Sequence, residues 1–79
     1  MRKQKIRIDV RGEKCPVPMV ETLKALRNAD IGSVIEVIGD HAPSKNEIIL
    51  ATKELGLKLV EVKNSNAWHI IIKKTKAVA

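Results

Sequence analysis

The chain has 79 residues, a net charge of +6, one tryptophan, no phenylalanine or tyrosine, and a single cysteine. This length suits one small domain, expected to span residues 1–79, with an aliphatic core and no internal disulfide. The composition disfavours the aromatic stacking surfaces of single-stranded nucleic-acid binders, a membrane span and a secretory signal, so we expect a reduced, cytoplasmic protein.

The first half of the chain predicts a strand, a helix and a second strand. Residues 5–10 (KIRIDV) alternate apolar and polar side chains, which is typical of a half-buried strand. A short connection containing Gly12 follows. Apolar residues then recur at helical spacing from Pro16 to about Ala29, with proline at the first helical position. Residues 34–38 (VIEVI) are mostly apolar and predict a central strand.

The second half predicts a helix and two strands. Ser44 followed by Glu47 is a capping-box pattern, so the helix is expected to begin there, after a loop over residues 39–43. Gly56 is the expected C-terminal glycine of this helix. Residues 57–62 predict a third strand with an irregular apolar phase. A hairpin turn at residues 64–66 leads to a fourth strand at residues 67–72 (AWHIII).

The order is therefore β-α-β-α-β-β. Two right-handed crossovers would place both helices on one face of a single sheet, giving a two-layer α/β (α+β) sandwich with one open face. The strand directions bring Cys15, Asp40 and His41 to one pole of the molecule. The basic residues of both chain ends are expected at the opposite pole.

Cys15 precedes a proline, which favours the extended conformation of a helix N-cap. A sulfur at a helix N-terminus would have a lowered pKa and would be a good nucleophile. Pro16 and Pro18 remove two N–H donors and leave those of Val17 and Met19 to the sulfur. Pro18 also stands where a C-x-x-C motif would have its second cysteine, which excludes a dithiol oxidoreductase. The residues alone leave open the alternative that Cys15 is a small buried side chain.

Three other side chains have two interpretations each. Arg11 could steady an anion at the sulfur or form an ion pair with Asp9 or Glu13. His41 could assist proton transfer or contact a partner, although an exposed loop histidine is the commoner case. His69 is expected on the surface of the sheet. Two separate histidines and one cysteine do not make a metal site, so neither a metal nor a cofactor is expected.

The stretch at residues 8–26 (IDVRGEKCPVPMVETLKAL) resembles the signature of the TusA/SirA/YeeD-like family of sulfur carriers. That signature is a hydrophobic-Asp-x-Arg-Gly-x-x-Cys-Pro-x-Pro run leading into the first helix. The matching residues are Asp9, Arg11, Gly12, Cys15, Pro16 and Pro18.

The resemblance implies a sheet ordered 1-2-4-3, with the fourth strand antiparallel. It also implies that Cys15 accepts sulfane sulfur as a persulfide. The partners would be a donor such as a cysteine desulfurase or a rhodanese-type protein, and an acceptor in tRNA thiolation, cofactor synthesis or sulfur metabolism. Whether such a carrier counts as an enzyme is a matter of convention.

One loop departs from the family pattern. Many members have an Asp-Pro pair after the second strand and an acidic residue early in the second helix. Here Asp40 and Pro43 are separated by two residues, and Glu47 is the candidate for the acidic position. Asp40 and His41 are therefore possible partner contacts whose departure from the pattern affects partner choice.

The rival hypothesis is a nucleic-acid-binding or regulatory module that uses the basic chain ends. Of the 15 basic residues, seven lie in residues 1–7 and 73–79, and the other 8 lie among all 9 acidic residues. Terminal lysines more often solvate a chain or protect strand edges than bind specifically. Direct binding of nucleic acid is thus the less favoured interpretation.

Overall fold

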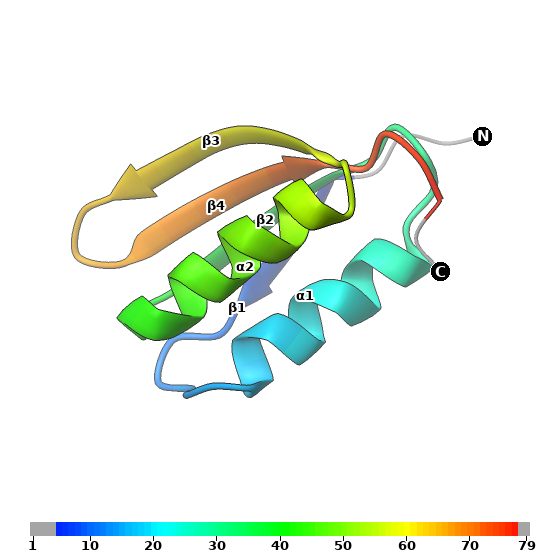
Figure 1. Cartoon of the computed structure of the whole chain (residues 1–79). Coiled ribbons are helices and arrows are strands. Elements are labelled where there is room, and N and C mark those ends of the chain that lie inside the picture. The colour runs from blue at the N-terminus through cyan, green and yellow to red at the C-terminus, as the bar shows by residue number, and fades with distance from the viewer. Residues whose placement is uncertain (1–4, 78–79) are drawn as a thin grey trace.

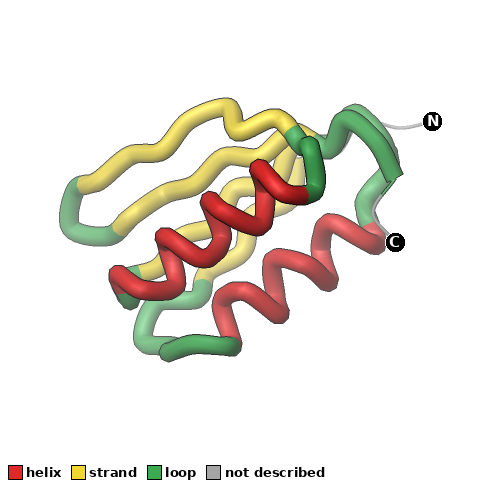
Figure 2. The backbone as a smooth tube through the Cα atoms, in the orientation of Figure 1, coloured by secondary structure: helices red, strands yellow, loops and turns green. Residues whose placement is uncertain are grey.

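The computed structural model describes residues 5–77, which form one four-stranded sheet and two helices. The sheet order is β1-β2-β4-β3, β1 pairs with β2 in parallel, and β4 is antiparallel to both of its neighbours. Both helices cover the same face of the sheet (Figures 1 and 2), so the predicted two-layer fold is confirmed. The elements are β1 (Lys5–Asp9), α1 (Val17–Asn28), β2 (Val34–Gly39), α2 (Ala42–Glu54), β3 (Lys58–Asn64) and β4 (Trp68–Lys73).

The core lies between the two interior strands and the helices. Alternate residues of β2 and β4 point towards the helices and are fully buried, as expected for a strand covered on that face. Aliphatic side chains from both helices close over them. The side chains with no exposed surface or almost none are Ile35 and Val37 of β2, Ile70 and Ile72 of β4, Leu26 of α1 and Ile48 of α2.

A close contact between Gly39 and Trp68 fixes one end of the sheet. A Cβ atom on Gly39 would lie 2.4 Å from the indole ring, so only glycine fits at this position of β2. The indole is buried, and its Nε1–H donates to the backbone oxygen of His41 at 3.1 Å. Trp68 therefore ties the start of β4 to the start of α2.

Both helices begin at residues other than those predicted. The N-cap of α1 is Pro16, so the prediction of Cys15 as N-cap is wrong by one residue. α2 begins at Ala42 rather than after Ser44, because Pro43 is tolerated in a first turn, where its missing N–H has no helical partner. Ser44 is buried within the helix, and its hydroxyl bonds to Nδ1 of His41 at 2.7 Å instead of forming a capping box.

The C-terminal end of α2 matches its prediction. Gly56 has a φ of +73°, its N–H donates to the oxygen of Lys53 at 3.1 Å, and the N–H of Leu57 donates to that of Thr52 at 3.1 Å. These two bonds form a Schellman motif. β3 follows, and a register shift between Leu59 and Glu61 explains the irregular apolar phase of its sequence.

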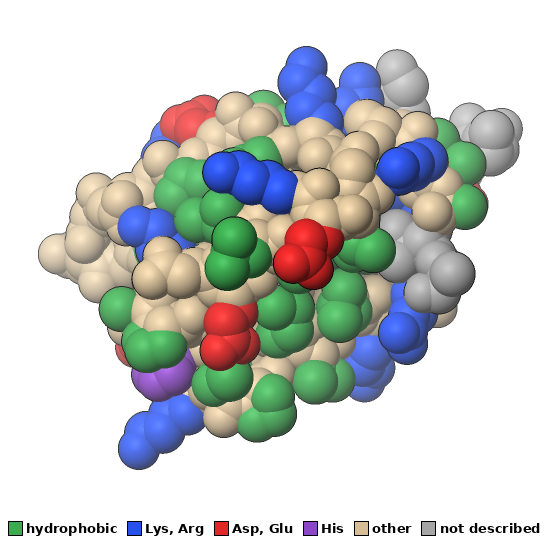
Figure 3. Space-filling view, viewed as in Figure 1, with side chains coloured by type: hydrophobic (Ala, Val, Ile, Leu, Met, Phe, Trp, Pro, Cys, Tyr) green, Lys and Arg blue, Asp and Glu red, His purple; other side chains and the backbone are tan. Residues whose placement is uncertain are grey.

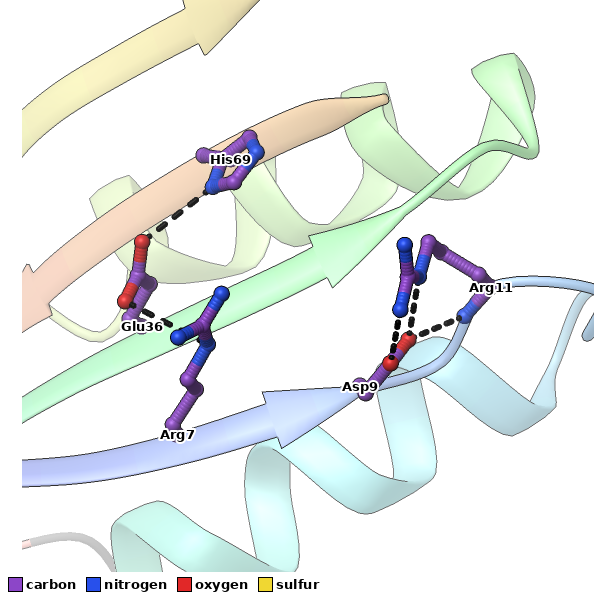
Figure 4. Close-up of polar contacts among 5 residues, drawn as sticks. All are labelled: Arg7, Asp9, Arg11, Glu36 and His69. Carbon is purple, nitrogen blue, oxygen red and sulfur yellow. Dashed lines mark hydrogen bonds and ion pairs between the residues drawn. The ribbon is translucent and has the colours of Figure 1, made fainter. Parts of the chain in front are cut away.

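The open face of the sheet carries a charged cluster that spans three strands. Glu36 of β2 lies between Arg7 of β1, at 3.9 Å, and Nδ1 of His69 of β4, at 3.2 Å (Figure 4). The hydrogen bond with His69 lowers the pKa of the Glu36 carboxyl. His69 is half-buried on this face, as predicted.

Candidate active site at the Cys15 pole

Cys15 lies in the loop between β1 and α1, at the end of the sheet where β1 and β2 finish. Its side chain is exposed, which rules out the interpretation of a small buried cysteine. The loop is fixed at its start, where the N–H of Val10 donates to the oxygen of Ile38 at 2.7 Å. Gly12 adopts a φ of +84°, and its N–H donates to Oδ1 of Asp40 at 3.0 Å. The loop that carries Cys15 is thus joined directly to the loop that follows β2.

Asp9 and Arg11 form a closed pair at the end of β1 (Figure 4). The guanidinium donates to both carboxylate oxygens, at 2.9 and 2.6 Å, and the backbone N–H of Arg11 adds a third bond at 3.1 Å. The side-chain hydrogen bonds from Arg11 lower the pKa of Asp9 to about 2. Among residues 5–77, no hydrogen bond joins Arg11 to Cys15, so the structure favours the ion-pair interpretation of Arg11.

The two prolines of the motif have different surroundings. Pro16 is exposed and follows a cis peptide bond with Cys15. Pro18 is buried, and its backbone oxygen accepts a hydrogen bond from Oγ1 of Thr22 at 2.7 Å. The N–H of Val17, which was expected to serve the sulfur, donates instead to the oxygen of Lys14 at 2.9 Å.

The thiol of Cys15 faces a carboxylate. Its Sγ lies 3.1 and 3.3 Å from the two side-chain oxygens of Glu47, on the second turn of α2. The hydrogen bond to Glu47, together with desolvation and the carboxylate charge, raises the pKa of Cys15. The prediction of a lowered pKa is therefore wrong, because Cys15 precedes the N-cap and its thiol contacts an anion.

Glu47 is the residue whose role the sequence reasoning missed. It was noted as an acidic residue early in the second helix, but its contact with the thiol was not predicted. The available signal was the strand polarity, which places the start of α2 at the same pole as Cys15. Predicting the contact between Glu47 and Cys15 also requires the true start of α2, at Ala42, which the capping-box pattern places too late.

Asp40 and His41 lie at this pole, as the strand directions predicted. Asp40 accepts the hydrogen bond from Gly12, and His41 is the half-buried N-cap of α2. Neither forms a hydrogen bond with Cys15 in the part of the chain that the structure describes. Their visible role is to hold the loops, and contact with a partner remains a proposal.

The two helices that follow the Cys15 pole expose apolar side chains. Hydrophobic side chains gather over the two helices in the space-filling view (Figure 3). Three large hydrophobic residues of the helices are exposed: Val17 and Val20 of α1, and Leu50 of α2. A separate open groove of about 500 Å³ runs along β1 and the start of α1, and Cys15 does not line it.

Two kinds of feature are absent from the part of the chain that the structure describes. Within residues 5–77, no three histidine, cysteine, aspartate or glutamate side chains gather in a way that could hold a metal ion. Over the same range, neither helix is long and apolar enough to cross a membrane.

Residues 6–74 match the family model described as Sulfurtransferase TusA. The chain belongs to this TusA family. It is 39% identical over 70 residues to a "Putative sulfur carrier protein" of Archaeoglobus fulgidus, covering 87% of this chain and 96% of that one. A protein with the same description from Thermotoga maritima is 44% identical over 68 residues, covering 84% of this chain and 86% of that one.

A solved structure has the same fold as this TusA-family chain. The crystal structure of a SirA-like protein from Desulfitobacterium hafniense has a TM-score of 0.77 and 26% identity, and the match covers 90% of this chain and 99% of that one. Membership of the family supports a sulfur carrier role, and with it a sulfur donor and a sulfur acceptor as partners.

Proposed function

We propose that Cys15 carries sulfane sulfur as a persulfide and relays it from a donor protein to an acceptor protein. The observation that carries this proposal is the exposed thiol of the chain's single cysteine, on a loop whose first residues are hydrogen-bonded to β2 and to the loop that follows it. With no second cysteine in the chain, a persulfide on Cys15 has no internal thiol to attack it. The sulfur therefore stays on the carrier until another thiol arrives.

Loading requires no external oxidant. The thiolate of Cys15 attacks the terminal sulfur of a donor persulfide, a new bond forms from Sγ to that sulfur, and the donor's own S–S bond breaks. The donor leaves as a thiolate and takes up a proton, while the thiol proton of Cys15 passes to solvent. One sulfur atom moves: the donor persulfide becomes a thiol, and the Cys15 thiol becomes a persulfide. Unloading is the same reaction with an acceptor thiol as the attacking group.

The remaining features of the proposal follow from this chemistry. The donor is expected to be a cysteine desulfurase or a rhodanese-type protein, since both classes form protein persulfides. Asp9, Arg11, Gly12, Pro16 and Pro18 support the loop, whereas Asp40 and His41 lie where a docked partner would approach. A free thiol persists in a reducing compartment, which supports a cytoplasmic location.

Mass spectrometry after incubation with a sulfane-sulfur donor tests the proposal. We expect an adduct of about 32 Da on Cys15, one sulfur atom, that dithiothreitol removes. The matched control is Cys15→Ser, which should acquire no adduct. An adduct that persists in this variant, or no adduct on the wild-type protein, would contradict persulfide carriage by Cys15.

A further inference from the structure

Glu47 is the charged side chain closest to the reacting atom of the proposed carrier. Both of its carboxylate oxygens lie within hydrogen-bond distance of Sγ of Cys15, at 3.1 and 3.3 Å. The two residues are 32 positions apart, so the contact depends on α2 packing beside the β1–α1 loop. A thiol can donate to this carboxylate, whereas a thiolate would be repelled by it.

The neighbouring charges do not compensate Glu47. In residues 5–77 it forms no ion pair with a lysine, arginine or histidine. Three cations of the loop and the helices have other partners: Arg11 pairs with Asp9, Lys45 donates to Asn64 at 2.7 Å, and Lys24 pairs with Glu21 at 3.8 Å. Asp40 accepts from Gly12, His41 bonds to Ser44, and Glu13 and Lys14 are exposed on the cysteine loop.

We propose that Glu47 keeps the unloaded Cys15 protonated and unreactive, and that a positively charged group of the sulfur donor releases the thiolate by pairing with Glu47 on docking. This proposal rests on the proposed function and adds the charge that the donor must present. Within residues 5–77 the half-buried carboxylate of Glu47 has the Cys15 thiol but no cation as partner, so a cation is the complementary group. Once Glu47 is paired, its repulsion of the thiolate is cancelled and the pKa of Cys15 falls.

The first measurement is the rate of alkylation of the unloaded protein by neutral iodoacetamide as a function of pH. Glu47→Gln keeps the shape of the side chain and removes its charge, so the thiolate fraction at neutral pH should rise. For each tenfold rise in thiolate, the lower nucleophilicity of the more acidic thiol leaves a net increase of about threefold in rate. The matched control is Glu54→Gln, an exposed glutamate of α2 away from the thiol, which should react like wild type.

The second measurement uses two symmetrical disulfides of opposite charge, cystamine and 3,3′-dithiodipropionate. In each reaction the Cys15 thiolate attacks one sulfur, a mixed disulfide forms, and the other half leaves as a thiolate. The wild-type protein and Glu54→Gln should favour the cationic disulfide over the anionic one. The preference should be about fivefold or more, because the attraction between two unit charges about 4 Å apart changes a rate by about that factor even in water. Glu47→Gln should lose most of this preference.

The behaviour of Glu47→Gln decides between the proposal and its failure. A Glu47→Gln variant with the alkylation profile and charge preference of Glu54→Gln, or with slower alkylation, would overturn the proposal. If Glu47→Gln does not fold, the wild-type preference for cystamine must still collapse at about 1 M salt, where the Debye length is only about 3 Å. These assays use the unloaded thiol and no persulfide. Failure of persulfide loading would therefore leave their outcome intact, and the two proposals can fail separately.

Discussion

Asp9, Arg11 and Gly12 shape the loop that carries the thiol, although within residues 5–77 the side-chain hydrogen bonds of the sulfur go to Glu47 and to none of these three. Asp9 and Arg11 are locked to each other by three hydrogen bonds, and Gly12 supplies the positive φ and the N–H that binds Asp40. A side chain at Gly12 would meet no neighbour within 4 Å, so the need for glycine there is conformational rather than steric. These residues of the motif are therefore explained by loop geometry.

The Asp9–Arg11 pair predicts an unusual titration. The pKa of Asp9 is about 2 in the folded protein, below its ordinary value of 3.8. Because the folded value is the lower one, the pair stabilises the fold above about pH 4, and this contribution is lost as the pH falls through about 2. We expect NMR of the Asp9 carboxyl carbon to give a midpoint near 2. In Arg11→Gln the midpoint should return towards 3.8, and an unchanged midpoint would show that the pair is absent in solution.

At the scale of single residues, the sequence located the thiol but not its protonation state. Local sequence reveals one charge near Cys15, the positive end of the dipole of the helix that follows, and this charge alone predicts a lowered pKa. The decisive charge is Glu47, which belongs to another helix and reaches Sγ through tertiary packing. Local reasoning cannot rank a nearby dipole against a carboxylate whose distance is unknown.

Among the elements, the C-terminus of α1 depends on a residue from the far end of the chain. Lys74 follows β4 and is buried, and its Nζ donates to the oxygens of Ala29, at 2.6 Å, and Arg27, at 3.5 Å. A lysine here satisfies carbonyls that the helix leaves free and opposes the negative end of its dipole. The interpretation of Lys74 as part of a solvated basic cluster is therefore wrong.

We expect Lys74→Met to destabilise the fold by about 1–3 kcal/mol, because it leaves buried carbonyl oxygens without a donor. The measurement is the free energy of unfolding in urea, followed by the fluorescence of the single tryptophan. Lys73→Met is the matched control, since Lys73 lies on the open face of the sheet and caps no helix. The control should change stability by less than about 0.5 kcal/mol. Equal losses in the two variants would contradict the capping role.

Element order and the placement of the helices could be predicted from the residues, and the strand order from the family resemblance, whereas the first turns of both helices could not be predicted. Alternation in β1 and the apolar run of β2 are strong signals, and handedness then leaves little freedom for the crossovers. The start of α2 was misplaced because Ser44 and Glu47 fit a capping box and Pro43 suggested a loop. In the structure, Pro43 lies inside the first turn and Ser44 is buried.

Across the whole molecule, the thiol and a row of three lysines, Lys5, Lys58 and Lys73, lie at opposite ends of the sheet. Lys5 and Lys73 flank Val34 in register, and Lys58 pairs with Lys73, so three lysines form a row across the open face. Arg2 and Lys3, which were expected in the same cluster, lie outside the described residues. Cys15 follows the other end of β1, and the five residues of that strand extend about 16 Å.

This separation predicts that the lysine row does not influence sulfur transfer. At physiological salt the Debye length is about 8 Å, so charges a full strand away from the thiol are screened. In a Lys58→Gln/Lys73→Gln double variant, the rates of Cys15 alkylation and persulfide loading should stay within about twofold of wild type. A larger fall in loading alone would show that the donor reaches both poles at once, and a larger fall in alkylation would show that the lysines act on the thiol directly; either would contradict independent action of the Cys15 pole. The same variant tests the rival hypothesis, because salt-dependent binding of a DNA oligonucleotide that it weakens and Cys15→Ser retains would assign a nucleic-acid role to the lysine row.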